Sequence, residues 1–162
     1  MKSRNGQINE IIKCGKDPVY FMNRYLKIQH PLRGLIPFKT FPFQDDCVQD
    51  FNDHRFNIIL KSRQLGLSTL VAAYAVWQAT FYKEKNILII ATKLAVAQNF
   101  IRKVKTYLKS MPKWLLVPVI TANNKQQVEF SNGSQVKAVP TSEDAGRSEA
   151  LSLLVVDEAA HI

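Results

Sequence analysis

Apolar and polar positions along the chain predict a succession of helices and strands. Residues 69–82 and 94–110 carry apolar side chains at helical spacing, so we expect two long amphipathic helices. Short apolar runs at 56–60, 87–91 and 153–156 have the length and composition of buried strands in a parallel sheet. The alternation of these segments predicts an α/β fold.

The first third of the chain is predicted to be mainly helical. Residues 7–29 indicate helix, restarted at Asp17-Pro18, because Asp suits an N-cap and Pro the first helical turn. Residues 31–42 contain several prolines and a glycine and are interpreted as a connector. A short helix is expected over residues 44–53.

A hairpin is predicted between the second long helix and the last strand. Residues 128–130 and 135–139 are strand-like and flank Asn132-Gly133, a pair that tolerates the positive φ angles of a tight turn. Strand, helix, strand, helix, hairpin and strand therefore describe a sheet with a β insertion.

Composition narrows the class of protein. The 162 residues are 46% hydrophobic, without an apolar run long enough to span a membrane, which is typical of a globular domain in the cytosol. Cys14 and Cys47 are isolated, which disfavours structural zinc or a disulfide. A net charge of +9 favours partners rich in phosphate, although the basic residues along 102–113 also fit a solvated helix face.

The segment from 61 to 69 is a candidate phosphate loop between a strand and a helix. A helix N-terminus approached by such a loop attracts anions through its backbone N–H groups and its dipole. The usual loop reads G-x-x-x-x-G-K-[ST], which matches here at Gly66 and Ser68 but places Lys61 at the first Gly and Leu67 at the Lys. The candidate loop consists of Lys61, Ser62, Arg63, Gln64, Leu65, Gly66, Leu67, Ser68 and Thr69.

The missing lysine needs a replacement, because a charge-assisted hydrogen bond to phosphate is worth about 1.5–3 kcal/mol. Arg63 is the preferred candidate, since its guanidinium is always charged and can grip phosphate oxygens as a fork. Lys61 is the alternative, and both side chains could instead cap the loop in solvent.

Ser68 of the loop and three further residues are candidates for a nucleoside-triphosphate site with Mg²⁺. The hydroxyl of Ser68 and the carboxylate of Asp157, at the end of an apolar strand, are candidate Mg²⁺ ligands. Glu158 follows directly and could orient or deprotonate the attacking water. Gln44 could read the adenine edge with its amide, or could simply pack at a helix N-terminus.

These motifs resemble those of one family, the large terminase subunits of tailed bacteriophages, which are DNA-packaging ATPases. Residues 61–69 resemble that family's variant Walker A loop, and residues 153–162 resemble its Walker B strand. Residues 127–134 and Ser142 to Arg147 are similar to its hairpin and to the segment before the Walker B strand.

The resemblance implies a fold and a set of roles. The fold would be a P-loop NTPase of the additional-strand, RecA- and helicase-like type, with three α-β-α layers around a mainly parallel sheet. Gln44 would read adenine, Arg63 would act on the γ-phosphate, Ser68 and Asp157 would hold Mg²⁺, and Glu158 would be catalytic. The implied partners are double-stranded DNA, the procapsid portal, the small terminase subunit and further copies of the chain, in the cytoplasm of the infected host and without a membrane.

The resemblance also implies a domain division, and two alternatives to it stay open. Residues 1–42 are expected to form a helical region with a connector, and residues 43–162 a partial ATPase core that ends after the Walker B strand, before the family's nuclease domain. One alternative is a superfamily-2 helicase-like translocase, which normally keeps the loop lysine. The other is a nucleotide-binding fragment without turnover.

Overall fold

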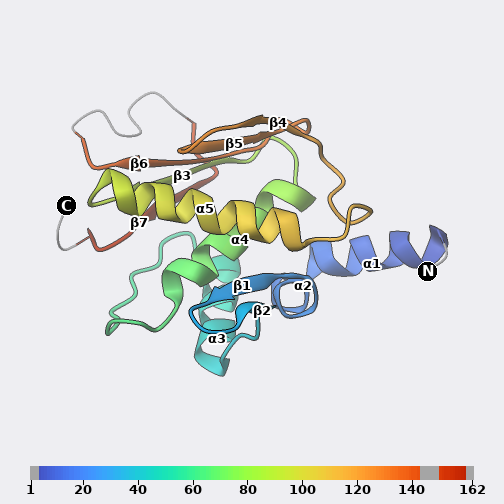
Figure 1. Cartoon of the computed structure of the whole chain (residues 1–162), viewed down its shortest axis with the longest axis horizontal. Helices are drawn as coiled ribbons and strands as arrows, with labels where there is room; N and C mark the ends of the chain where they lie inside the picture. Colours follow the sequence, from blue (N-terminus) through green and yellow to red (C-terminus); the bar gives the residue numbers. More distant parts are fainter. Residues whose placement is uncertain (1–3, 143–149, 160–162) are drawn as a thin grey trace.

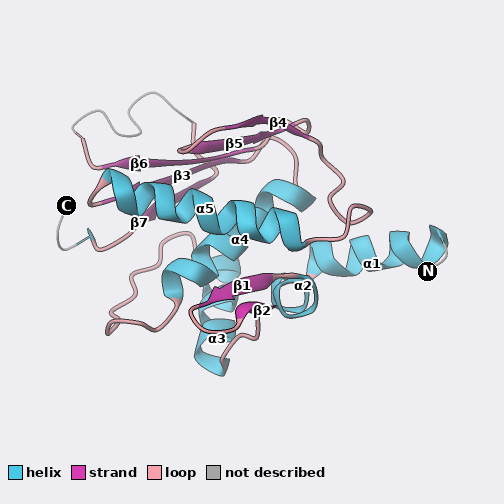
Figure 2. Ribbon diagram, viewed as in Figure 1, coloured by secondary structure: helices cyan, strands magenta, loops and turns pink. Residues whose placement is uncertain are grey.

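The computed structural model describes residues 4–142 and 150–159. Its elements are, in chain order, α1 (Arg4–Lys16), α2 (Pro18–Tyr25), β1 (Lys27–His30), β2 (Gly34–Pro37), α3 (Pro42–Asp53), α4 (Leu67–Phe81), β3 (Asn86–Ala91), α5 (Leu94–Ser110), β4 (Ile120–Asn123), β5 (Gln127–Phe130), β6 (Gln135–Pro140) and β7 (Leu153–Val156). Figure 1 shows their arrangement, and Figure 2 separates helices from strands.

The main sheet is mixed rather than mainly parallel. Its five strands lie in the order β4-β5-β6-β3-β7. The strand β3 pairs in parallel with both β6 and β7, whereas β4–β5 and β5–β6 are antiparallel. The prediction of a mainly parallel sheet is therefore wrong, because the β insertion contributes two antiparallel pairs.

The helices α4 and α5 pack on one face of this sheet, and β1, β2, α2 and α3 lie beyond them (Figure 1). Alternate residues of β5 and β6, such as Val128 and Val136, are buried against the helices, while Glu129 and Lys137 point to the other face. Within residues 4–142 and 150–159 the structure thus has a sheet with helices on one face, and the third layer of the predicted α-β-α sandwich is not found there.

One buried core joins the N-terminal region to the sheet and its helices. Phe21 and Met22 of α2 belong to the same buried cluster as Trp77 of α4 and Val136 of β6. The indole N–H of Trp77 donates to the Cys14 carbonyl at 2.8 Å, which fixes the end of α1 against α4. The proposed boundary at residues 42 and 43 stays a prediction.

Several predicted elements are confirmed. The helix α5 begins at Leu94 and ends at Ser110 as its apolar spacing predicts, and β3 and β7 fall on the predicted apolar runs. The strands β5 and β6 form the predicted hairpin, with Gly133 at φ +80° in its turn.

The predicted helix over 7–29 is wrong after Tyr25, because residues 27–30 form a strand. The strand β1 pairs with β2 inside the predicted connector, and Gly34 at φ +68° ends the turn between them. The Lys27 N–H donates to Ser110 Oγ at 3.2 Å, so packing against the end of α5 favours the extended conformation over helix.

The predicted strand over 56–60 is also wrong. This segment has no strand conformation and pairs with no strand of the described residues, and Ile58 and Leu60 are fully exposed. An apolar run becomes a strand only when a neighbouring strand accepts its backbone hydrogen bonds. The edge strand β7 is paired with β3 and with no other strand of the described residues.

Candidate functional site

The phosphate-loop segment is an exposed turn that leads directly into α4. Residues 61–66 are exposed, and two of them, Gln64 at φ 64° and Gly66 at φ 72°, have left-handed backbone conformations. Left-handed residues within a turn can direct successive N–H groups into one concavity, which is a common way to bind an anion. The Gly66 carbonyl accepts the first helical hydrogen bonds, from the N–H groups of Thr69 and Leu70.

Gln44 holds this loop against the N-terminus of α3. Its side chain is only 3% exposed. Its amide nitrogen donates to the Leu65 carbonyl at 3.0 Å, and its amide oxygen accepts from the Phe41 N–H at 3.2 Å. The Gln44 amide was predicted to read adenine. Its nitrogen and its oxygen both form hydrogen bonds within the protein instead.

Two exposed aromatic rings lie beside Gln44. Phe41 and Phe43 stack with their ring centroids 5.9 Å apart and their planes 7° apart. They provide an apolar surface next to the loop on which a nucleotide base could pack.

The two predicted motifs meet at the N-terminus of α4. Ser68 Oγ lies 3.4 Å from Asp157 Oδ2, although the two residues are 89 positions apart in the sequence. The Asp157 N–H donates to the Ile90 carbonyl at 2.9 Å, which extends the pairing of β7 with β3 and fixes the carboxylate at the end of the strand. The sheet thereby brings a hydroxyl and a carboxylate together beside the loop.

The other predicted residues lie in the loop and directly after Asp157 in the sequence. Glu158 is exposed and has a left-handed backbone conformation at φ 55°, and Lys61 and Arg63 are exposed in the loop. Leu67, at the position that the motif gives to lysine, is instead buried in the core with an exposed fraction of 6%. A hydrophobic contact therefore replaces the expected ammonium at this position.

Sequence reasoning did not name Lys103 as a residue of this site, because it grouped the lysine with the basic residues along 102–113, which could contact nucleic acid or face solvent. The side chain is half-buried, and its Nζ lies 5.5 Å from the centroid of the buried Phe100 ring. Burial lowers the pKa of Lys103, and the negative charge of Asp157 opposes that shift. No motif marks this lysine; the signal in the sequence is its position three residues after Phe100 and four before Tyr107, on the packed face of the helix.

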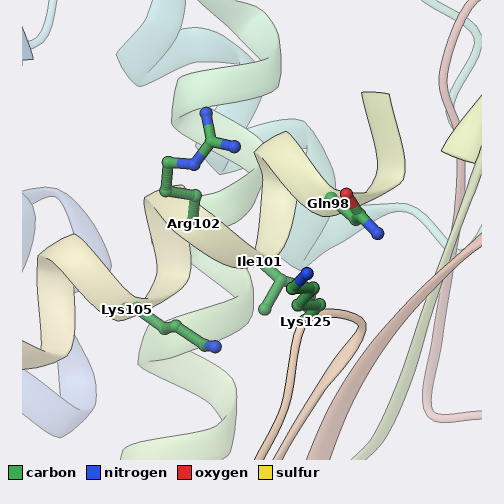
Figure 3. A pocket seen from close by; sticks show the side chains of 5 residues that line it. All are labelled: Gln98, Ile101, Arg102, Lys105 and Lys125. Carbon is green, nitrogen blue, oxygen red and sulfur yellow. The ribbon is translucent and has the colours of Figure 1, made fainter. Parts of the chain in front are cut away.

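A second basic feature lies along the same stretch of α5. A pocket of about 310 Å³ is lined by Gln98, Ile101, Arg102, Lys105 and Lys125. Figure 3 shows Lys105 and Lys125 on either side of Ile101. The Lys105 ammonium donates to the Asn124 carbonyl at 2.7 Å, which ties the helix to the turn before β5.

Some predicted features lie outside the described residues, namely the segment from 143 to Arg147 and the residues after 159. Among the helices of the described residues, none has both the length and the apolar character required to cross a bilayer.

The geometry defines a class of site, in which an exposed turn that leads into a helix N-terminus lies beside a carboxylate at the end of a strand in an α/β sheet. The family described as terminase large subunit, T4-like virus type, N-terminal, matches residues 58–162. The chain belongs to this terminase large-subunit family, and the resemblance seen in its motifs is confirmed.

A solved structure supports the fold. The crystal structure of the HK97 bacteriophage large terminase is similar over 88% of this chain, with a TM-score of 0.65 and 16% sequence identity. The matched region covers 37% of the HK97 chain. The chain therefore spans little more than a third of that protein.

Proposed function

We propose that this chain is the ATP-hydrolysing motor part of a viral terminase that drives double-stranded DNA into procapsids. The observation that carries the proposal is the 3.4 Å approach of Ser68 Oγ to Asp157 Oδ2 at the N-terminus of α4. Two segments 89 residues apart meet there with the hydroxyl and the carboxylate that a Mg²⁺-nucleotide site requires.

The loop and α4 would bind the phosphates. The 15-residue helix carries a partial positive charge at its N-terminus, and its first turn contains no acidic side chain. The left-handed residues Gln64 and Gly66 give the loop the backbone curvature of an anion-binding turn. The exposed rings of Phe41 and Phe43 are the adjacent surface for the base.

The Ser68–Asp157 pair fits Mg²⁺. Mg²⁺ prefers hard oxygen ligands at about 2.0–2.1 Å, so two ligand atoms of one ion lie at most about 4 Å apart. The two side-chain oxygens satisfy that condition without rearrangement. The ion would neutralise charge on the phosphate oxygens, and the chain would contribute the oxygens that hold it.

We assign catalytic roles in ATP hydrolysis to Glu158 and Arg63. Glu158 is exposed next to Asp157, where its carboxylate could accept a proton from the attacking water. Arg63 is exposed in the loop, and its guanidinium would stabilise the charge that develops on the transferred phosphoryl group.

ATP turnover by the wild-type chain and by Glu158→Gln tests the assignment of hydrolysis. We expect phosphate release from ATP by the wild-type chain and none by the variant, which should still bind a nucleotide. Turnover that persists in Glu158→Gln would reject the catalytic assignment. A folded wild-type chain that binds ATP without turnover would favour the alternative of a binding fragment.

Arg63→Ala tests the second assignment. By analogy with arginine fingers, the rate should fall by roughly 10³–10⁵-fold. Arg55→Ala removes another exposed arginine from the segment before the loop and should leave the rate unchanged. Near-normal turnover in Arg63→Ala would shift the role to Lys61.

The basic pocket on α5 supports the DNA part of the proposal. Three of its five lining residues are cationic and none is acidic, so it offers a site for backbone phosphates on a chain of net charge +9. The portal, the small terminase subunit, assembly into a homo-oligomer and a location in the cytoplasm of the infected host complete the proposal by family resemblance.

The salt dependence of duplex DNA binding tests this surface. In Lys105→Ala/Lys125→Ala, the slope of log affinity against log salt concentration should become shallower by about 1 to 2, since each lost phosphate contact contributes about 0.9. The control Arg4→Ala/Lys16→Ala removes two exposed charges from α1 and should keep the wild-type slope. Equal slopes in all three proteins would exclude the pocket as a DNA contact.

A further inference from the structure

Lys103 lies on a face of α5 that packs toward the phosphate loop. Phe100, Lys103 and Tyr107 follow at intervals of three and four residues, so they share one side of the helix. Phe100 and Tyr107 are buried, and the Tyr107 hydroxyl donates to the Thr69 carbonyl at 2.9 Å. This contact places the face of α5 against the first turn of α4, next to Ser68.

The ammonium of Lys103 is held in this packed region. Its Nζ lies 5.5 Å from the centroid of Phe100, and the side chain is half-buried. Asp157 is the charged group whose field acts on Lys103: it supports the protonated form while burial lowers the pKa. Asp157 is the carboxylate that meets Ser68.

The loop leaves a place for such a cation. Leu67 is buried in the core, so the position that normally supplies an ammonium cannot do so. Lys61 and Arg63 belong to the exposed turn. Lys103 belongs to a different element, the helix α5, which packs against α4.

We propose that Lys103 is a phosphate-binding residue that supplies the ammonium absent at Leu67. In the empty site its charge balances the Asp157 carboxylate. With a nucleoside triphosphate and Mg²⁺ bound, Asp157 would hold the ion and the Lys103 ammonium would turn to the phosphate oxygens. A lysine suits both states, because its charge sits on a flexible four-carbon stem. This inference rests on the proposed function.

Equilibrium binding of a labelled, slowly hydrolysed ATP analogue with Mg²⁺ tests the inference. Lys103→Met removes the charge and keeps an unbranched apolar stem to pack over Phe100. The affinity should fall by about tenfold to a hundredfold, which corresponds to the loss of one charge-assisted hydrogen bond. The matched control Lys109→Met lies at the exposed end of the same helix and should bind as tightly as the wild type.

Two comparisons separate a charge effect from a packing effect. Lys103→Arg keeps the positive charge and should retain binding within a few-fold of the wild type. The loss in Lys103→Met should also be larger for the triphosphate than for ADP, which has one phosphate fewer to contact. Equal losses in the Met and Arg variants, or equal losses for the two nucleotides, would overturn the inference in favour of packing alone.

The remaining outcomes distinguish this inference from the proposed function. Wild-type binding that requires Asp157 and is unchanged in Lys103→Met would overturn the role of Lys103 and leave the nucleotide site standing. A wild-type chain that is folded by circular dichroism and binds no nucleotide would overturn both.

Discussion

Gly66 is the residue on which the geometry of the loop depends most. It has a left-handed backbone at φ +72°, and a Cβ atom added there would lie 3.0 Å from the amide nitrogen of Gln44. That amide donates to the Leu65 carbonyl and so holds the loop in place. A side chain at position 66 would therefore strain the backbone and displace the group that supports the loop.

Gly66→Ala should lower the free energy of unfolding by about 1–3 kcal/mol, from left-handed strain and the loss of the Gln44 contact. It should also weaken nucleotide binding. Urea denaturation measures the free energy of unfolding, and titration with a labelled ATP analogue measures the affinity for nucleotide.

The matched control is Gly15→Ala, in the last turn of α1. A Cβ there meets the Phe81 side chain at an ordinary 3.6 Å, so stability should stay the same or rise slightly. Equal effects of the two substitutions would contradict this account of the loop.

Much of the candidate site could be predicted at this scale. The spacing of Gly66 and Ser68 marked the loop, and Asp157 followed from an apolar run that ends in two carboxylates. The roles of these residues stay predictions. Lys103 could not be found in this way, because its position near Asp157 depends on how α5 packs against α4.

At the scale of elements, the β5–β6 turn also completes the end of α4. The last carbonyl groups of a helix have no partner within it. The Asn132 amide nitrogen donates to the carbonyls of Ala79 and Tyr82 at 2.9 and 3.0 Å, and Ser134 Oγ donates to the Tyr82 carbonyl at 3.0 Å. The hairpin therefore fixes the C-terminus of the helix whose N-terminus faces Asp157.

Asn132→Ala should lower the free energy of unfolding by about 1–3 kcal/mol, since it removes these two bonds and takes the Asn132 donor from the Ala79 carbonyl, while the Tyr82 carbonyl keeps its bond from Ser134 Oγ. The Asn57→Ala control loses one exposed bond to the His54 carbonyl and should change stability by less than about 0.5 kcal/mol. Thermal denaturation followed by circular dichroism measures both. An unchanged melting temperature in Asn132→Ala would show that the turn does not support α4.

The β5–β6 turn shows which structural features a short sequence pattern can predict and which it cannot. Asn132-Gly133 correctly indicated a hairpin, and Gly133 has the required positive φ angle. The pattern gave no sign that the Asn132 side chain caps a helix about 50 residues earlier. Likewise, the spacing of apolar residues extended the predicted helix to residue 29, whereas β1 begins at Lys27, pairs with β2 and contacts the end of α5.

At the scale of the whole molecule, one apolar segment stays outside the core. Phe56, Ile58 and Leu60 are exposed, and the outer residues of β7, Leu154 and Val156, are partly exposed as well. Periodicity cannot predict this, because a run of apolar residues is the same whether or not a neighbouring strand is present to pair with it.

Matched substitutions measure whether residues 56–60 are packed in solution. Ile58→Ala should change the free energy of unfolding by no more than about 0.5 kcal/mol, since the side chain is already exposed. Ile87→Ala, in the buried strand β3, should cost about 2–5 kcal/mol. A large loss in Ile58→Ala would contradict the exposed conformation of this segment.

We propose that the loop over 61–69 and Asp157 form one Mg²⁺-dependent phosphate site. The most direct test is equilibrium binding of a labelled, slowly hydrolysed ATP analogue, at increasing Mg²⁺ concentration, to the wild-type chain and to Asp157→Asn. We predict saturable binding that Mg²⁺ strengthens in the wild type and does not strengthen in the variant. An affinity that depends on neither Mg²⁺ nor Asp157, or no binding by a folded wild-type chain, would exclude such a site.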